Sequence, residues 1–135
     1  YLPCDETTLP TGDVAMVDGT GFDFRTSRPV EGTFDHNFCL ADLRRDIAPV
    51  AQLSSPRSRL SMQVSTTEPG LQLYTGQGLT GVGSSHGGHG NGPFAGICLE
   101  PQSWPDAPNN ASFPPIDLAP GERYQQVSEF AFSQR

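Results

Sequence analysis

Short runs of alternating apolar and polar residues recur along this chain, separated by residues that are typical of turns. A period of two predicts β-strands, because successive side chains of a strand point to opposite faces of the sheet. We expect strands over residues 13–17, 34–40, 60–66, 71–75, 96–100 and 124–132. Residues 41–47 fit a short helix or a loop equally well. The pattern therefore predicts an all-β protein built as an antiparallel β-sandwich, or as part of one.

Two long segments lack this alternation and are expected to be loops. Residues 76–92 are rich in glycine, which predicts an exposed connection. Residues 101–115 hold five prolines and Trp104, which favours an ordered irregular loop over a strand. With 15 glycines and 13 prolines among 135 residues, the chain is rich in turns and poor in long helices. Its length suits a single domain.

The charge of the chain limits the partners that it can take. Eight basic residues, all of them arginine, stand against 15 acidic ones, so the net charge is −7. We expect neither a nucleic-acid partner nor a membrane partner, because both surfaces are negatively charged. Without lysine the chain cannot form a lysine Schiff base or use a P-loop lysine. No apolar run approaches the roughly 18 residues of a membrane span.

The three cysteines, Cys4, Cys39 and Cys98, are far apart in the sequence and odd in number. A disulfide framework usually has an even number of cysteines, and a zinc site usually has closely spaced pairs. We therefore expect buried, reduced thiols and a cytoplasmic location. A periplasmic or secreted location stays open, because the sequence begins at Tyr1 rather than at a methionine.

Three polar side chains interrupt otherwise apolar strands and are the candidates for chemistry. Glu100 ends the apolar stretch 96–100, where partial desolvation makes a carboxylate a better proton acceptor, so it is a candidate general base. Asp35 and Gln72 point away from the apolar neighbours on their own predicted strands. Carboxylates and an amide on one sheet face, with Trp104 near them, suit the hydroxyls and the C–H faces of a sugar. The alternative is that these side chains only face solvent.

Two histidines in the glycine-rich segment raise the question of a metal site. His86 and His89 lie three residues apart, but neither a third ligand nor a rigid support is close to them in the sequence. A flexible linker is therefore the favoured interpretation, and we expect no metal.

Several motifs, in this order along the chain, together resemble the C-terminal part of the aldose 1-epimerases, the galactose mutarotases. They are LPTG at 9–12, FDFR at 22–25, FDHNF at 34–38, STTEPGLQLYTG at 65–76, CLEPQSWPDAPN at 98–109 and LAPGERY at 118–124. The resemblance covers nearly the whole chain, apart from residues 41–58 and the histidine-containing loop. It implies that residues 1–135 are the C-terminal portion of a single aldose 1-epimerase domain, with the N-terminal half absent. The implied fold is part of a galactose-mutarotase-like supersandwich.

The resemblance also implies an activity. It implies an isomerase of hexose metabolism that interconverts the α and β anomers of free hexoses such as galactose or glucose. In the family, the glutamate that matches Glu100 is the general base, and the residues that match Asp35 and Gln72 bind sugar hydroxyls. The general-acid histidine belongs to the N-terminal half. No cofactor is expected, because the reaction consists of proton transfers around a labile C–O bond.

The chain departs from the family pattern near the expected base. The family's His-Ser pair before the catalytic strand is Phe94-Ala95 here, and Pro101 replaces a threonine, which removes an N–H donor. His36 matches a family histidine but is expected on the opposite sheet face from Asp35. We expect the isolated chain to be inactive or incomplete, and half a sandwich to need a second copy or a companion chain. The alternative functions are a non-catalytic carbohydrate-binding module and a histidine-loop metal protein.

Overall fold

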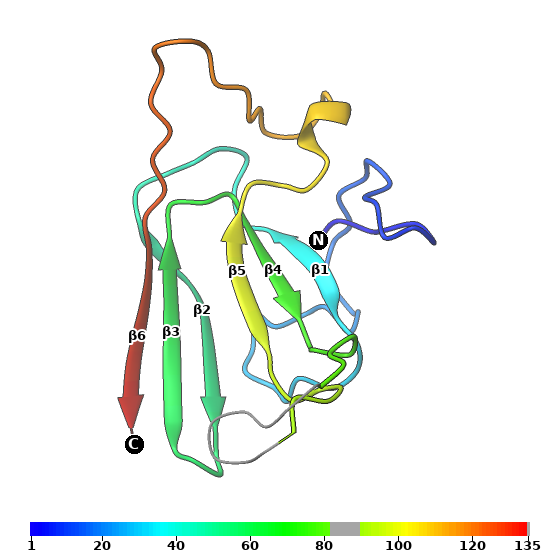
Figure 1. The fold of residues 1–135 in the computed structure, drawn as a ribbon, viewed down its shortest axis with the longest axis vertical. Coiled ribbons are helices and arrows are strands. Elements are labelled where there is room, and N and C mark those ends of the chain that lie inside the picture. The colour runs from blue at the N-terminus through cyan, green and yellow to red at the C-terminus, as the bar shows by residue number, and fades with distance from the viewer. Residues whose placement is uncertain (82–89, 135) are drawn as a thin grey trace. The chain divides into compact units, whose positions relative to one another are not determined.

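The computed structural model describes residues 1–81 and 90–134, and its regular structure is almost entirely strand (Figure 1). The elements are β1 (Asp35–Cys39), β2 (Ala48–Ser55), β3 (Leu60–Thr66), β4 (Gly70–Tyr74), β5 (Cys98–Gln102), the short 3-10 turn η1 (Ala107–Asn109) and β6 (Ser128–Gln134). The prediction of an all-β chain with antiparallel strands is confirmed.

The chain divides into two compact units. Unit 1 consists of Tyr1–Phe38 and Gln72–Glu100, and unit 2 consists of Cys39–Leu71 and Pro101–Arg135. One sheet has the strand order β1-β4-β5, and most residues of its strands belong to unit 1. The other sheet has the order β2-β3-β6 and belongs entirely to unit 2.

A cluster of aromatic rings forms the core of unit 1. The ring of Phe22 stacks on Tyr1 with centroids 3.8 Å apart, and its contacts with Phe34, His36 and Phe38 reach one side of β1. Phe34, His36 and Phe38 therefore lie on one side of the sheet. Because successive strand residues alternate between faces, Asp35 is directed to the other, polar face of β1.

A glycine controls how the chain leaves β4. Gly76 has φ of 74°, and its carbonyl accepts hydrogen bonds from the N–H groups of Phe94 at 2.8 Å and Leu79 at 3.2 Å. A Cβ atom at this position would lie 2.6 Å from the carbonyl oxygen of Gly96, which is closer than van der Waals contact allows. Only glycine fits both this backbone conformation and this close approach.

In unit 2 the central strand is β3. Its residues pair with β2 on one side and with β6 on the other, both antiparallel. Met62 and Val64 lie opposite Phe132 and Phe130, so these four side chains share one face of the sheet. Val64 is fully buried, whereas Phe132 is 64% exposed. The apolar face of this sheet is thus only partly covered by the described residues of its own unit.

Strand β2 is the strand that the pattern analysis missed. The second residue of β2 is Pro49, and the pairing of β2 with β3 shifts register between Pro49 and Ala51. A bulge of this kind breaks the strict alternation on which the prediction depended. Residues 41–47 form a loop, which is one of the two expected alternatives.

The strand predicted at residues 13–17 is not formed. Ala15 exchanges two backbone hydrogen bonds with Tyr1, at 2.8 and 2.9 Å, but this pairing does not extend into a ladder. Met16 is 74% exposed, so the apolar residues of this run are not fixed by burial. A short apolar run without a neighbouring strand to pair with stays irregular.

Candidate active site

The structure brings Asp35 and Gln72 together and puts Glu100 on the adjacent strand. Asp35 is the first residue of β1, Gln72 is the middle residue of β4, and Glu100 is the middle residue of β5. Strand β4 lies between the other two. The side-chain amide of Gln72 donates a hydrogen bond of 2.7 Å to a carboxylate oxygen of Asp35. All three residues belong to unit 1.

Two cysteine thiols lie near the carboxylates of this cluster, and the carboxylate charges affect the pKa values of both thiols. Partial burial raises the pKa of the Cys98 thiol, and the carboxylate of Glu100, its hydrogen bond to Cys98 and the charge of Asp35 raise this pKa further. Burial also raises the pKa of Cys4, with smaller contributions from Asp35 and Asp5. Cys98 is therefore close to both Glu100 and Asp35. It is exposed, which corrects the expectation that the cysteines are buried.

His36 belongs to the other side of β1, where its surroundings favour the neutral imidazole. Burial lowers the pKa of its imidazole, and the charge of Asp35 opposes this effect. One ring nitrogen, Nδ1, accepts a hydrogen bond of 3.1 Å from the backbone N–H of Asp35. With its ring against Phe22, His36 supports the core of unit 1 and does not belong to the polar cluster.

The surroundings of Glu100 differ from the expectation in two ways. Strand β5 does not end at Glu100 but continues through Pro101 to Gln102, and the Pro101 carbonyl accepts a hydrogen bond of 3.0 Å from the Gln126 side chain. The Glu100 side chain is exposed in the chain as described, so the partial desolvation predicted from a strand-end position is not found. Water, or a ligand that replaces it, has direct access to this carboxylate.

The cluster can recognise a polyhydroxylated ligand. Two carboxylates accept hydrogen bonds from hydroxyl groups, and the Gln72 amide can both donate and accept. The bond between Gln72 and Asp35 fixes the orientation of both side chains before any ligand arrives. The Glu100 carboxylate, exposed on the strand next to β4, can accept a proton from a hydroxyl held by the other two.

Trp104 does not have the sugar-stacking position that the sequence suggested. Its side chain is only 6% exposed and packs edge-on against Phe113, with ring centroids 5.3 Å apart. The indole N–H donates a hydrogen bond of 3.0 Å to the carbonyl of Pro69. These contacts make Trp104 a core residue of unit 2, because a buried ring has no free face for a ligand.

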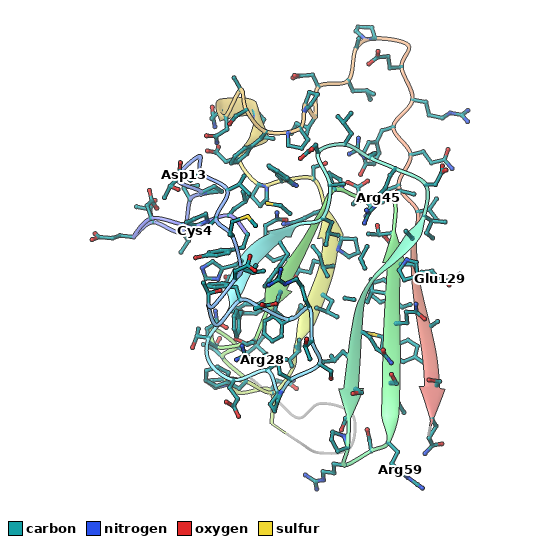
Figure 2. All side chains as sticks on the ribbon, turned by 180° about the vertical axis from the view of Figure 1, so that it is seen from behind. Cys4, Asp13, Arg28, Arg45, Arg59 and Glu129 are labelled. Carbon is teal, nitrogen blue, oxygen red and sulfur yellow. The ribbon has the colours of Figure 1, made fainter. Side chains whose placement is uncertain are left out.

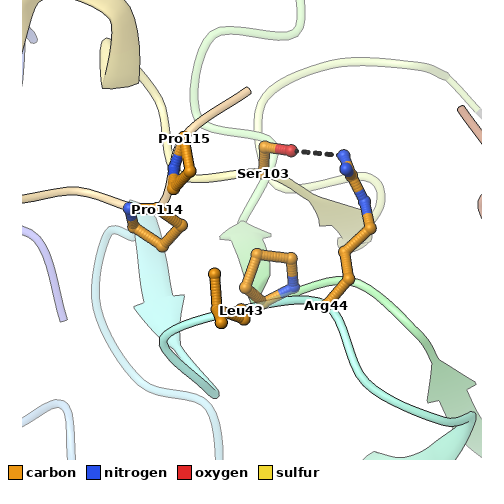
Figure 3. Close-up of a pocket in the computed structure, with 6 residues that line it drawn as sticks. Leu43, Arg44, Ser103, Pro114 and Pro115 are labelled. Atoms are coloured by element: carbon orange, nitrogen blue, oxygen red, sulfur yellow. Dashed lines mark hydrogen bonds between the residues drawn. The ribbon is translucent and has the colours of Figure 1, made fainter. Parts of the chain in front are cut away.

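A charged network in unit 2 was not foreseen. The Glu68 carboxylate is fully buried, and the Arg44 guanidinium donates to both of its oxygens, at 2.7 and 3.3 Å. Arg44 and Ser103 also line a pocket of about 290 Å³ whose other walls are formed by Leu43, Pro69, Pro114 and Pro115 (Figure 3). The pocket contains neither the predicted base Glu100 nor the predicted sugar-binding residues Asp35 and Gln72.

The histidine-loop interpretation falls on residues that the structure does not describe, since His86 and His89 lie outside residues 1–81 and 90–134. Within those ranges, no three histidine, cysteine or acidic side chains are grouped so that they could hold a metal ion. In the same part of the chain, no helix is long and apolar enough to cross a membrane.

Comparison with known proteins gives consistent matches over almost the whole chain. The sequence model of the family described as aldose 1-epimerase matches residues 1–131. The chain is 44% identical over 145 residues to galactose mutarotase of Bos taurus, covering 98% of this chain and 41% of that protein. It is 34% identical to aldose 1-epimerase of Escherichia coli (strain K12), with 98% and 42% covered.

A solved structure agrees with the sequence matches. The GalM/aldose epimerase homologue from C. elegans is similar with a TM-score of 0.85 and 26% identity, covering 98% of this chain and 42% of that chain. The chain therefore spans about two fifths of the length of the relatives that it matches.

Proposed function

Because the chain belongs to the aldose 1-epimerase family, we propose that it provides the base and part of the sugar-binding face of an enzyme that interconverts the α and β anomers of free hexoses. In this proposal residues 1–135 are the C-terminal portion of a single aldose 1-epimerase domain. Galactose and glucose are the proposed substrates. The observation that carries the proposal is the 2.7 Å bond from Gln72 to Asp35, with Glu100 on the next strand of the same sheet.

The proposed reaction begins at the anomeric hydroxyl. Asp35 and Gln72 bind sugar hydroxyls and present the anomeric O1–H to Glu100, which takes the proton. A general acid protonates the ring oxygen, so that the C1–O5 bond breaks and a free aldehyde forms. Rotation about C1–C2 and closure on the opposite face of the carbonyl, with both protons returned, complete the exchange of anomers. Each positioned proton-transfer group contributes roughly 10²–10⁴-fold to such a reaction.

The general acid is proposed to come from outside residues 1–135. The family resemblance assigns this role to a histidine of the N-terminal half. His36 is unsuited to it, because its ring packs into the aromatic core on the other side of β1 and its pKa is lowered by burial. We expect the 135-residue chain alone to bind galactose without accelerating its mutarotation.

Polarimetry on freshly dissolved α-D-galactose tests the proposal, using the protein in which these residues are accompanied by the rest of the domain. We expect Glu100→Gln to lower the rate at least about 100-fold, which corresponds to about 2.7 kcal/mol of transition-state stabilisation. Glu31→Gln is the matched control, because Glu31 is an exposed carboxylate elsewhere in unit 1. A Glu100→Gln protein as fast as the control would remove the assignment, and saturable galactose binding without rate enhancement would indicate a carbohydrate-binding module instead.

We infer that the apolar face of the β2-β3-β6 sheet is covered by further polypeptide in the functional protein. Phe130 and Phe132 are exposed on the same face as the buried Val64. An uncovered apolar face of this kind favours association. A second copy or a companion chain is the proposed cover when the 135-residue chain is alone. Light scattering that finds a stable, well-dispersed monomer would contradict this inference.

The cytoplasm is the proposed location. In support, Cys4 and Cys98 form no disulfide among the described residues, which suits a reducing compartment. Fractionation of cells that express the protein tests this location.

A further inference from the structure

The buried carboxylate of Glu68 is held by a network that joins three separate segments of unit 2. Arg44 binds both Glu68 oxygens, and its Nη2 also donates to the Ser103 hydroxyl at 2.9 Å (Figure 3). Ser103 in turn donates to Glu68 Oε2 at 3.3 Å. The ring of Tyr124 covers the guanidinium, with its centroid 4.3 Å from the central carbon. The Glu68 side chain is 0% exposed, so these partners supply the hydrogen bonds and the counter-charge that a buried carboxylate needs.

The network acts on the ends of two strands that carry proposed site residues. Glu68 lies two residues before the start of β4 and four before Gln72. Ser103 follows the last residue of β5 and lies three residues after Glu100. A second link joins the same two segments, since the Trp104 indole donates to the Pro69 carbonyl at 3.0 Å. The segment that enters β4 is thus tied to the segment that leaves β5.

We propose that Arg44 is a positioning residue for sugar binding, which sets the register of the β4 and β5 strand ends through Glu68 and Ser103 and thereby aligns Gln72 and Glu100. This inference rests on the proposed function. Arg44 lies in the 41–58 stretch, outside the motifs that carry the family resemblance.

The physical reason is the cost of an unpaired buried charge. Without Arg44, Glu68 would have to move toward water or admit water to its site, because a buried carboxylate without a partner is strongly unfavourable. Either change displaces the backbone just before β4. A shift of a few tenths of an ångström there disturbs the 2.7 Å bond between Gln72 and Asp35, and binding sites lose affinity steeply with such misplacements.

The test follows the side-chain amide of Gln72 by NMR, in protein labelled with ¹⁵N-glutamine. Its signal is identified as the one that Gln72→Glu removes. We expect Arg44→Met, examined below its unfolding temperature, to displace this signal. In the protein in which these residues are accompanied by the rest of the domain, we expect it to raise the KM for galactose about tenfold. Arg45→Met is the matched control, because Arg45 is an exposed neighbour whose backbone, not its side chain, is bonded to Thr67 (Figure 2). The control should move the signal little and keep KM within about twofold.

A merely structural Arg44 would lower the unfolding temperature and leave the Gln72 signal of the folded protein unchanged, and that result would overturn the proposal. If Arg44→Met does not fold, Arg44→Lys takes its place, since lysine keeps the positive charge but lacks the planar fork that reaches Glu68 and Ser103 together. A displaced Gln72 signal in folded Arg44→Lys supports the proposal, and an unmoved one overturns it. The NMR signal requires no catalysis, so the test stays readable even if Glu100→Gln proves fully active.

Discussion

The carboxylates of unit 1 and the carboxylate at the centre of unit 2 have opposite environments. Asp35 and Glu100 are exposed on β1 and β5, the two outer strands of one sheet, where the Gln72 amide is bonded to Asp35 and the Cys98 thiol lies near both carboxylates. Glu68 is fully buried, and an arginine and a serine satisfy its oxygens. An exposed carboxylate with one hydrogen bond keeps acceptor capacity for a ligand, whereas a buried and fully paired one has none left. This difference separates groups that can act on a substrate from a group that stabilises the fold.

The largest expected effect is on the free energy of unfolding. It should differ clearly between a variant that disturbs the buried carboxylate and one that alters an exposed carboxylate. Arg44→Met leaves the Glu68 carboxylate buried and unpaired, and we expect a loss of about 3 kcal/mol in the free energy of unfolding, the lower end of the range for a broken buried pair because Arg44 is 34% exposed. Asp35→Asn keeps an acceptor for the exposed Gln72 amide and should change stability by no more than about 0.5 kcal/mol. Urea unfolding measures both.

The same urea measurement can contradict the difference drawn between the exposed and the buried carboxylates. An Asp35→Asn variant as destabilised as Arg44→Met would show that the unit 1 carboxylate stabilises the fold as much as the buried pair does. Arg45→Met, which removes an exposed arginine beside Arg44, shows how much of the loss comes from deleting a positive charge alone.

A smaller effect is expected at the Cys98 thiol, and it tests whether Glu100 belongs to the polar cluster. Burial is the main cause of the raised pKa of Cys98, and the Glu100 charge raises this pKa further. Glu100→Gln therefore lowers the pKa of the thiol and increases the thiolate fraction. We expect alkylation of Cys98 by iodoacetamide at pH 8 to become several-fold faster, followed by peptide mass spectrometry. If Cys98 is alkylated no faster in Glu100→Gln than in Glu31→Gln, the Glu100 charge does not act on Cys98, and Glu100 does not belong to the cluster with Asp35.

The smallest effect concerns His36, on the core side of β1. Its pKa in the folded chain lies below the ordinary value of 6.5, chiefly because of burial. As the pH falls below 6.5, the unfolded chain takes up a proton more readily than the folded chain, so stability decreases. Replacing His36 with asparagine removes this contribution. The urea midpoint of unfolding should therefore decrease more between pH 7.5 and pH 5.5 in the unmodified protein than in His36→Asn. Equal decreases in the two proteins would contradict the assignment.

The parts of the fold that follow local rules could be predicted from the sequence. Strand β3 matches the predicted range 60–66, because it pairs along its whole length with β2 on one side and β6 on the other and its apolar residues alternate with polar ones. Strand β2 escaped prediction because of Pro49 and the register shift beside it. The run 13–17 has the composition of a strand, but a strand also needs a partner along its length, and composition does not report that.

The same reasoning applies to the candidate site. Asp35 and Gln72 could be predicted because each is a polar residue on the open face of an apolar strand, a signal contained in a few neighbouring residues. The pair of Arg44 and Glu68 joins residues 24 positions apart, both outside regular strands, and no periodicity marks it. The burial of Trp104 likewise depends on its contacts with Pro69 and Phe113, which a proline-rich loop sequence does not reveal.

The exit from β4 sets a limit on how freely this protein can be redesigned. Gly76 has a left-handed backbone, and a methyl group there would collide with the main-chain oxygen of Gly96, an atom that no change of rotamer can move. Directed-evolution libraries aimed at new sugar preferences can therefore randomise the residues around Gln72, but position 76 should be kept constant. Any other amino acid at position 76 would give chains in which β4, the strand of the proposed sugar-binding residue Gln72, is followed by a distorted turn.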